Sequence, residues 1–180
     1  RFTDYFAAAR CVRALAQSGL NPTNCRLIDA QEALGTGAGD GSASLLVLGF
    51  ESADHPQDAK FARATELVRD HGGIIDAPKA EAAHREGAAG AWRNAFLRAP
   101  FYREVLVPMG VIVDTFETAV TWDRFPTFHA EITRRIGDML TRVTGKPGHV
   151  TCRFTHVYPD GPAPYFTFQA LGRMSALLEQ

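Results

Sequence analysis

Cysteine is scarce in this sequence, and no metal-binding spacing is present. Its three cysteines form no CxxC pair, and its six histidines form neither HxH nor HxxxH. An odd number of cysteines argues against a disulfide framework, and the scattered ligands argue against a zinc site. We therefore expect no metal, a reducing compartment and small buried thiols.

Strong charge and long apolar runs are lacking as well. The net charge is −1, and 46% of the 180 residues are hydrophobic. A near-neutral chain is a poor general nucleic-acid binder, because such binding needs a basic face that displaces counterions. No apolar run approaches the roughly 20 residues of a membrane-spanning helix, and no signal peptide precedes the first expected helix. We expect one cytoplasmic domain, with peripheral association with membranes left open.

The apolar pattern alternates between two periods. Helical spacing predicts helices at 4–17, 56–71, 80–97 and 125–143, and a helical turn at 29–34. The helix at 56–71 is expected to have Phe61, Ala64, Leu67 and Val68 on its apolar face, and another helix is expected to begin at 176–180. Short apolar runs predict strands at 25–28, 43–50, 74–75, 111–120, 150–158 and 165–171. The last two strands form a hairpin, and an irregular connection is expected between Pro100 and Pro108. The fold class is therefore α+β, an antiparallel sheet with helices packed mainly on one face.

A glycine-rich stretch at 35–42 could be a plain loop or a loop that cradles phosphate. No GK[S/T] sequence follows it and no helix opens directly after it. We therefore favour a plain loop over a phosphate cradle.

Arg26 is the first candidate for chemistry. It lies between apolar residues in a short predicted strand. A guanidinium in that position could hold an anion or stabilise developing negative charge. An ion pair with Asp29, or exposure to solvent, is the alternative.

Arg103 is the second candidate, in an aromatic segment that suits bidentate binding of phosphate or carboxylate. A structural ion pair with Glu104 or Glu117 is the alternative. On a strand, Glu117 shares one face with Thr115, whereas Thr118 lies on the other. A buried Glu117 would need a cationic partner.

Tyr165 is the third candidate. Alternation puts it on one face of a strand with Thr167, while Phe166 and Phe168 take the other face. Its hydroxyl could act as a general acid or base, with an ordinary core tyrosine as the alternative. His156, in the neighbouring predicted strand, is more often a structural histidine than a catalyst.

Taken in order, these segments resemble a known family. The residues that carry the resemblance are Cys25-Arg26-Leu27-Ile28-Asp29, Phe101-Tyr102-Arg103-Glu104, Asp114-Thr115-Phe116-Glu117-Thr118 with Trp122-Asp123, Cys152-Arg153-Phe154, His156-Val157-Tyr158 and Tyr165-Phe166-Thr167-Phe168. The series resembles the C-terminal "cap" portion of FAD-linked oxidases of the vanillyl-alcohol-oxidase type, and within them the alkyldihydroxyacetonephosphate synthases. It covers essentially the whole chain and implies one ferredoxin-like cap domain, 1–180.

The resemblance also implies roles for single residues. In that family FAD lies in a separate N-terminal domain, and the cap closes over the flavin ring. By position, Arg103 would bind the substrate phosphate and Tyr165 would be the proton donor and acceptor. Arg26 would be an arginine needed for activity near the flavin. The remaining pocket candidates are Glu117, Thr118 and His156.

The implied activity is exchange of the acyl group of acyl-dihydroxyacetonephosphate for a fatty alcohol, in ether-lipid synthesis. The family's FAD-binding domain and histidine-rich motif are missing from the sequence, so we expect a fragment that is inactive alone. Its expected partners are the FAD domain of the same chain and a small substrate bearing phosphate or carboxylate, with a homodimer left open.

Two alternatives remain open. The chain could be the cap of a 2-hydroxyacid oxidase or dehydrogenase of the glycolate or D-lactate type, in which Arg103 holds a carboxylate. It could also be a non-catalytic α+β binding or dimerisation module.

Overall fold

The computed structural model describes residues 1–75, 90, 94, 97, 101 and 103–173. Five antiparallel strands form one sheet in the order β2-β1-β4-β5-β3. The strands are β1 Asn24–Ile28, β2 Leu45–Gly49, β3 Val111–Glu117, β4 His149–Val157 and β5 Pro162–Leu171. The helices include α1 Tyr5–Gln17, α2 Ala30–Gly35, α3 Asp58–Asp70 and α5 Phe125–Thr144.

Local sequence sets the ends of these helices. Asp4 and Asp29 cap the starts of α1 and α2, each accepting a backbone N–H with its carboxylate. Gly145 ends α5 in the left-handed conformation, at φ 77°, where glycine carries no Cβ penalty. These boundaries agree closely with those predicted from the sequence.

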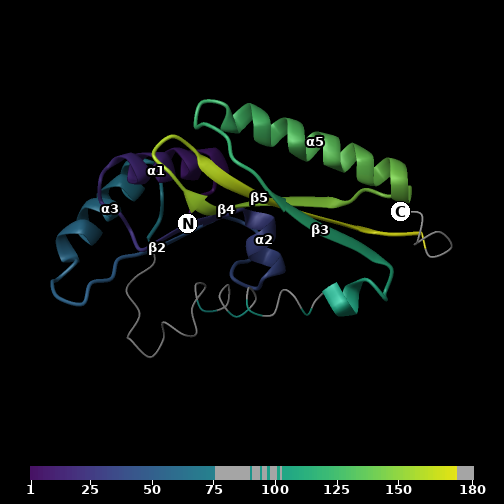
Figure 1. The fold of residues 1–180 in the computed structure, drawn as a ribbon, viewed down its shortest axis with the longest axis horizontal. Helices are drawn as coiled ribbons and strands as arrows, with labels where there is room; N and C mark the ends of the chain where they lie inside the picture. Colours follow the sequence, from purple (N-terminus) through teal and green to yellow (C-terminus); the bar gives the residue numbers. More distant parts are fainter. Residues whose placement is uncertain (76–89, 91–93, 95–96, 98–100, 102, 174–180) are drawn as a thin grey trace.

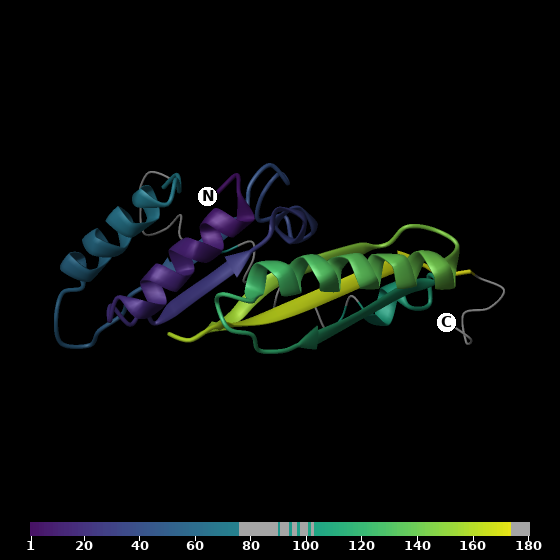
Figure 2. The ribbon, with the colours of Figure 1, turned by 90° about the horizontal axis from the view of Figure 1, so that it is seen from above.

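The main core lies between the sheet and two helices. Figures 1 and 2 show α1 and α5 on the same side of the sheet, with α3 beside α1. Fully buried side chains from both layers meet there, including Phe125 of α5, Phe154 of β4 and Phe166 of β5. Tight aromatic contacts join them, since the rings of Phe125 and Phe154 are 4.9 Å apart.

The short helix α2 is the exception, because it packs on the opposite side of the sheet (Figure 1). Ile28 and Leu45 of the sheet meet Ala33 and Ala38 there in a second, smaller apolar cluster. Helices therefore cover mainly one face, and the predicted α+β class with an antiparallel sheet is confirmed.

Three local predictions were wrong. Ile74 forms no strand with Ile75; its backbone bonds to Arg1 instead, which leaves no ladder to extend. The segment from Arg103 to Leu106 is helical and not irregular, because no proline interrupts it. Phe61, expected on the apolar face of α3, is 52% exposed, while Ala64 and Val68 of that face are buried.

Two further predictions lie outside the described residues. These are most of the expected helix at 80–97 and the beginning of a helix at the end of the chain. Of the helices that the structure describes, none is long and apolar enough to cross a membrane.

Candidate functional site

The strand register gathers polar side chains on the side of the sheet that faces away from α1 and α5. Arg153 of β4 pairs with Tyr165 of β5, and Tyr165 pairs with Glu117 of β3. The alternating residues Phe154, Phe166 and Phe116 point into the core. We call the side that carries Arg26, Thr115, Glu117, Arg153 and Tyr165 the polar face.

Two contacts hold Tyr165, one on its hydroxyl and one on the face of its ring. Its hydroxyl donates a hydrogen bond to Oγ1 of Thr115, at 2.8 Å. The guanidinium carbon of Arg153 lies 3.9 Å from the centre of its ring, a cation–π contact. Tyr165 is half-buried on the polar face and is not a core tyrosine, because Phe166 beside it takes the core position.

Arg153 is in turn held by a buried carboxylate. Its Nη1 lies 2.5 Å from Oε1 of Glu32, and the Glu32 side chain is only 7% exposed. Thr151 donates to the other carboxylate oxygen of Glu32 at 3.4 Å. The Nε of Arg153 is buried and has no acceptor among the described residues. A buried donor without a partner is uncommon and needs an explanation.

Asp29 fixes the position of Glu32. One carboxylate oxygen accepts the N–H of Glu32 at 2.7 Å, and the other accepts the N–H of Cys152 at 2.5 Å. Burial raises the pKa of Asp29 to about 6, against the pull of these hydrogen bonds. Asp29 thus joins the end of β1, the start of α2 and β4 directly before Arg153.

A β-bulge in β4 explains the surroundings of Glu117. The register shifts between Phe154 and His156, which makes Thr155 the extra residue. Two consecutive residues then reach one carboxylate: the Thr155 hydroxyl donates to Oε1 of Glu117, and His156 Nδ1 lies 3.3 Å from it. The bond from Thr155 holds the pKa of the Glu117 carboxyl below its usual range.

The sequence predicts that Glu117, if buried, would need a cationic partner such as arginine. In the structure it is exposed, and a hydroxyl and an imidazole contact it.

Arg26 lies on the same polar face, beside Ile28 of β1 and opposite in direction to Leu27, which enters the core. It lines a hollow of about 660 Å³ together with Thr155 and His156. Leu15 and Ala16 of α1 line the same hollow, so it lies at the end of the sheet beside α1, where Arg26 comes near Thr155 and His156.

Arg103 lies near the other edge of the sheet. Its guanidinium is 3.7 Å from Asp114, and both side chains are more than half exposed. Neither Glu104 nor Glu117 is the partner in this ion pair. By strand alternation Asp114 points to the side of Phe116, away from Tyr165, whereas Thr118 follows the end of β3, where its N–H donates to the carbonyl of Pro164. An exposed pair at this distance holds Arg103 only weakly, so its guanidinium can turn toward a ligand.

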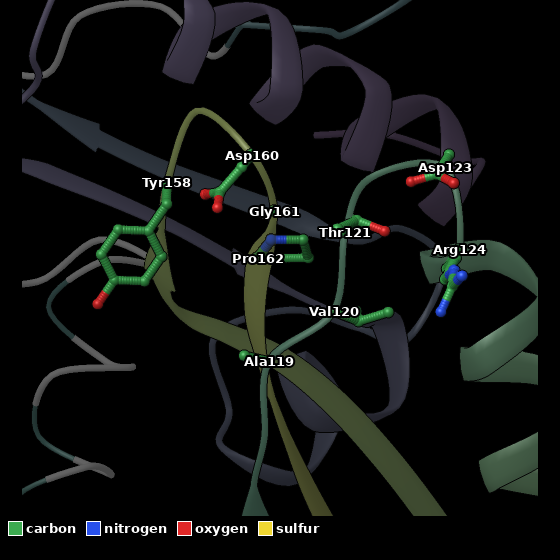
Figure 3. Close-up of a pocket in the computed structure, with 9 residues that line it drawn as sticks. All are labelled: Ala119, Val120, Thr121, Asp123, Arg124, Tyr158, Asp160, Gly161 and Pro162. Atoms are coloured by element: carbon green, nitrogen blue, oxygen red, sulfur yellow. The ribbon is translucent and has the colours of Figure 1, made fainter.

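A second hollow, of about 850 Å³, lies between the β3–α5 connection and the β4–β5 turn (Figure 3). Its lining includes Asp123, Arg124, Tyr158 and Asp160, drawn as sticks in the figure. None of the predicted site residues lines it, so we assign it no part in the chemistry.

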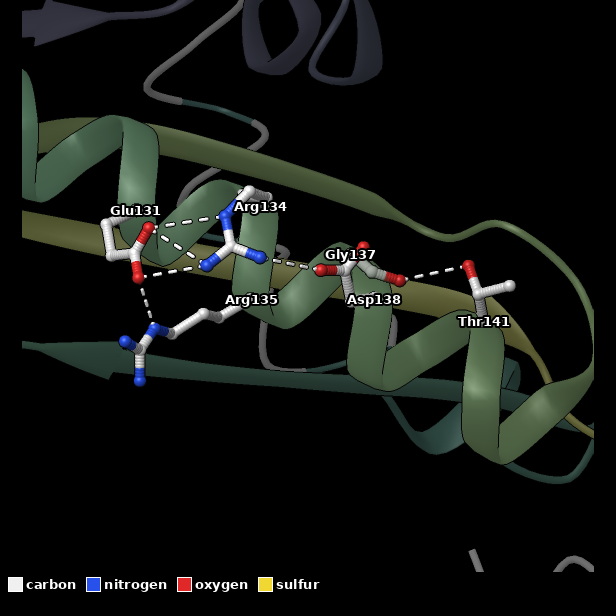
Figure 4. A network of polar contacts seen from close by, with 6 residues as sticks. All are labelled: Glu131, Arg134, Arg135, Gly137, Asp138 and Thr141. Atoms are coloured by element: carbon white, nitrogen blue, oxygen red, sulfur yellow. Dashed lines mark hydrogen bonds and ion pairs between the residues drawn. The ribbon is translucent and has the colours of Figure 1, made fainter.

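Exposed charges also gather on the outer side of α5. Glu131 binds Arg134 and Arg135, and Arg134 also reaches Asp138 (Figure 4). Such exposed pairs stabilise a helix only slightly. No group of three potential metal ligands occurs within the described ranges.

Sequence reasoning missed three members of the polar face: Thr115 as a partner of Tyr165, Arg153 and Glu32. Alternation along β4 puts the side chain of Arg153 on the opposite side of the sheet from Phe154, so the sequence could have indicated on which side Arg153 lies. The cross-strand register, and the bulge that changes it, could not be derived from the sequence.

The fold defines an α+β domain whose sheet has one side packed into the core and one polar face. The whole chain, residues 1–180, matches the family described as "FAD linked oxidases, C-terminal domain", and the chain belongs to that family. A search of curated proteins finds no match.

Solved structures agree on the fold. Two structures of alkyldihydroxyacetonephosphate synthase superpose on this chain with TM-scores of 0.75 and 0.71, each at 18% identity. They cover 97% and 99% of this chain, but the chain spans only 35% and 37% of theirs. At that identity the likeness shows a common fold, and the activity of the whole protein is a separate question.

The family implies that the full-length protein binds FAD. On the polar face Thr115 and Glu117 are exposed, so their polar groups are open to a neighbouring group. In the glycine-rich loop, packing accounts for Gly39 and Gly41, because Cβ atoms there would meet Ala33 and Leu34 at 3.3 Å.

Proposed function

We propose that this chain is the substrate-binding domain of an FAD-dependent enzyme whose substrate carries a phosphate or carboxylate. The observation that carries the proposal is the fixed Tyr165 hydroxyl, held against Thr115 on a face that also presents Arg26. A tyrosine oriented this precisely on a polar face can hold or move a proton at its Oη.

The proposed division of work follows the geometry. Arg103, weakly paired and exposed, binds the anionic end of the substrate. Arg26 adds a fixed positive charge beside the hollow that it shares with His156. FAD, when bound, supplies the chemistry that amino-acid side chains lack. Glu117 and His156 complete the polar surroundings, and Thr118, directly after β3, is a further candidate to line the pocket.

The specific reaction that we propose is acyl-to-alkyl exchange on acyl-dihydroxyacetonephosphate, as in the synthases that share this fold. Support comes from the fold, from the family and from a set of residues that includes an arginine for a phosphate and a tyrosine for a proton. The enzyme would then contribute to ether-lipid synthesis.

The full-length protein with its flavin tests this choice. Incorporation of a labelled fatty alcohol into acyl-dihydroxyacetonephosphate is the expected result. Rapid bleaching of the flavin by glycolate or D-lactate, without incorporation, would instead identify a 2-hydroxyacid oxidase or dehydrogenase. Failure of both reactions would leave the non-catalytic module as the better description.

Tyr165→Phe tests the proposed role of the Tyr165 hydroxyl. The change removes only the hydroxyl, so turnover should fall by about 10²–10⁴-fold while the FAD content stays unchanged. Tyr158→Phe is the matched control, because the ring of Tyr158 is 53% exposed and lies in the separate hollow of Figure 3. Full turnover in Tyr165→Phe would reject the acid–base role.

A further inference from the structure

We propose that Arg153 is a positioning residue for Tyr165 and that Glu32 acts through Arg153. The inference rests on the proposed role of Tyr165 in the reaction. It adds two residues to that role, neither of which would contact the reacting atoms.

The first argument is the geometry around the tyrosine ring. Arg153 and Tyr165 are cross-strand partners, and the guanidinium lies 3.9 Å from the ring centre. The hydroxyl at the far end donates to Thr115 on the next strand, at 2.8 Å. A side chain with two rotatable bonds is fully oriented by one contact on its ring face and one on its hydroxyl. The position of the oxygen therefore depends on Arg153.

The second argument is the way Arg153 is itself fixed. Its side chain is 15% exposed, and that of its partner Glu32 is 7% exposed. Glu32 is the third residue of α2, a helix of six residues, and the carboxylate of Asp29 links the start of that helix to β4. The chain of contacts thus runs from α2 through β4 and β5 to β3 without a gap.

A purely structural ion pair is a weaker explanation for this arrangement. Well-packed apolar residues often replace a buried ion pair without loss of stability. In this pair Arg153 Nε is buried and has no acceptor among the described residues. A buried donor without an acceptor costs free energy of folding, which a pair kept only for stability would have to offset. An arginine kept for its planar shape explains both the stacking on the ring and the single-sided pairing with Glu32.

The effect on turnover follows from the sensitivity of proton transfer to distance. A misplacement of the reacting group by 1 Å can cost about 10²-fold in rate. Removal of the guanidinium frees the ring, so Arg153→Met should lower kcat by about 10²-fold. Glu32→Gln keeps the size of the side chain and loosens the guanidinium, so its effect should be smaller, about tenfold. KM should stay within about twofold for both variants, because neither residue binds substrate.

The experiment compares these two variants and their combination in the full-length protein with its flavin. Because Glu32 acts through Arg153, the double variant should be no slower than Arg153→Met alone. Arg153→Lys should recover little, because an ammonium does not stack on the ring as a planar guanidinium does. Glu131→Gln and Arg134→Met, which change the exposed ion pairs of α5, are the matched controls and should leave kcat unchanged (Figure 4).

A second readout does not depend on turnover. The ring signals of ¹³C-labelled tyrosine, assigned to Tyr165 by their loss in Tyr165→Phe, report the environment of the ring directly. They should shift and sharpen in Arg153→Met and shift partly in Glu32→Gln. They should not change in Arg134→Met.

The two readouts separate the failure of this proposal from that of the proposed function. Unchanged ring signals and unchanged kcat in Arg153→Met, or multiplied effects in the double variant, would overturn the positioning role. If Arg153→Met does not fold, Glu32→Gln decides the question by the same two measurements. If Tyr165→Phe retains full turnover, the proposed function fails, and the ring signals still show whether Arg153 positions the tyrosine.

Discussion

Among single residues, Asp29 connects three elements of the fold through one side chain. Its carboxylate accepts N–H groups from α2 and β4, and its own N–H donates to the carbonyl of Cys152 at 3.2 Å. The sequence shows it only as the first residue of a predicted helical turn. Its burial comes from the packing of β4 against β1, which no local pattern reveals.

The raised pKa of Asp29, about 6 against an ordinary 3.8, gives a prediction with a definite sign. Between these two values the folded protein binds more protons than the unfolded chain, so this group's contribution to stability is lost as the pH rises from about 4 to 6. Asp29→Asn cannot ionise. It should be less stable than the wild type near pH 4 by about 1 kcal/mol, because one backbone N–H loses its acceptor.

The difference between Asp29→Asn and the wild type should shrink or reverse as the pH rises from about 4 to 6, and it should change little above pH 6. Urea unfolding at a series of pH values measures it, with Asp40→Asn as an exposed control. A difference that stays constant from pH 4 to 7 would contradict the raised pKa.

At the scale of elements, two glycines of similar appearance in the sequence have opposite roles. A Cβ on Gly161, in the β4–β5 turn, would collide with the backbone of Val120 and Thr121. The β3–α5 connection therefore lies directly on this turn, where Trp122 Nε1 also donates to the carbonyl of Tyr158 at 3.1 Å. Gly137 lies inside α5, and nothing approaches its Cβ position within 4 Å.

Alanine at these two positions should therefore change stability in opposite directions. Gly161→Ala should destabilise the protein by about 2 kcal/mol or more, because backbone atoms must move apart. Gly137→Ala should stabilise it by about 0.5–1 kcal/mol, because alanine is the better residue inside a helix. Thermal unfolding of both variants under the same conditions measures the two shifts. Equal destabilisation by both would show that the close approach at Gly161 is wrong.

The elements also show how far sequence reasoning reaches. Helices α1, α3 and α5 were predicted within about two residues, because each has an apolar stripe and α1 and α5 have clear terminal residues. Strand faces followed from alternation, which placed Tyr165 and Phe166 correctly on opposite sides. The ion pair of Arg153 with Glu32 joins residues 121 positions apart, so it depends on the register of β1 with β4 and could not be predicted.

At the scale of the whole molecule, the proposed anion-binding arginines lie toward opposite edges of the sheet. Arg26 is on β1, and Arg103 contacts β3, with β4 and β5 between them. Three strand spacings amount to roughly 14 Å. Once Arg103 turns from Asp114 to the polar face, two side chains that far apart would contact different ends of an extended substrate, with Tyr165 between them on β5.

This separation predicts independent effects on catalysis. Arg26→Met and Arg103→Met should each lower kcat/KM by about 10–100-fold in the full-length protein, because each removes one charge-assisted contact. The double variant should show the product of the two effects, within about 0.5 kcal/mol, as expected for distant sites. The free energies come from kcat/KM of the two single variants and the double variant, with flavin content as the check on folding.

The additivity of these two arginines contrasts with the coupling expected between Glu32 and Arg153, which are in direct contact. Measured together, the two cycles test the arrangement of the sheet itself, since one pair spans it and the other joins α2 to the central strand β4. Strong coupling between Arg26 and Arg103, above about 1 kcal/mol, would mean that both hold the same group of the substrate. Arg103 would then have to leave Asp114 and cross the polar face when substrate binds, and the substrate would be small, such as a 2-hydroxyacid, and not a long-chain acyl ester.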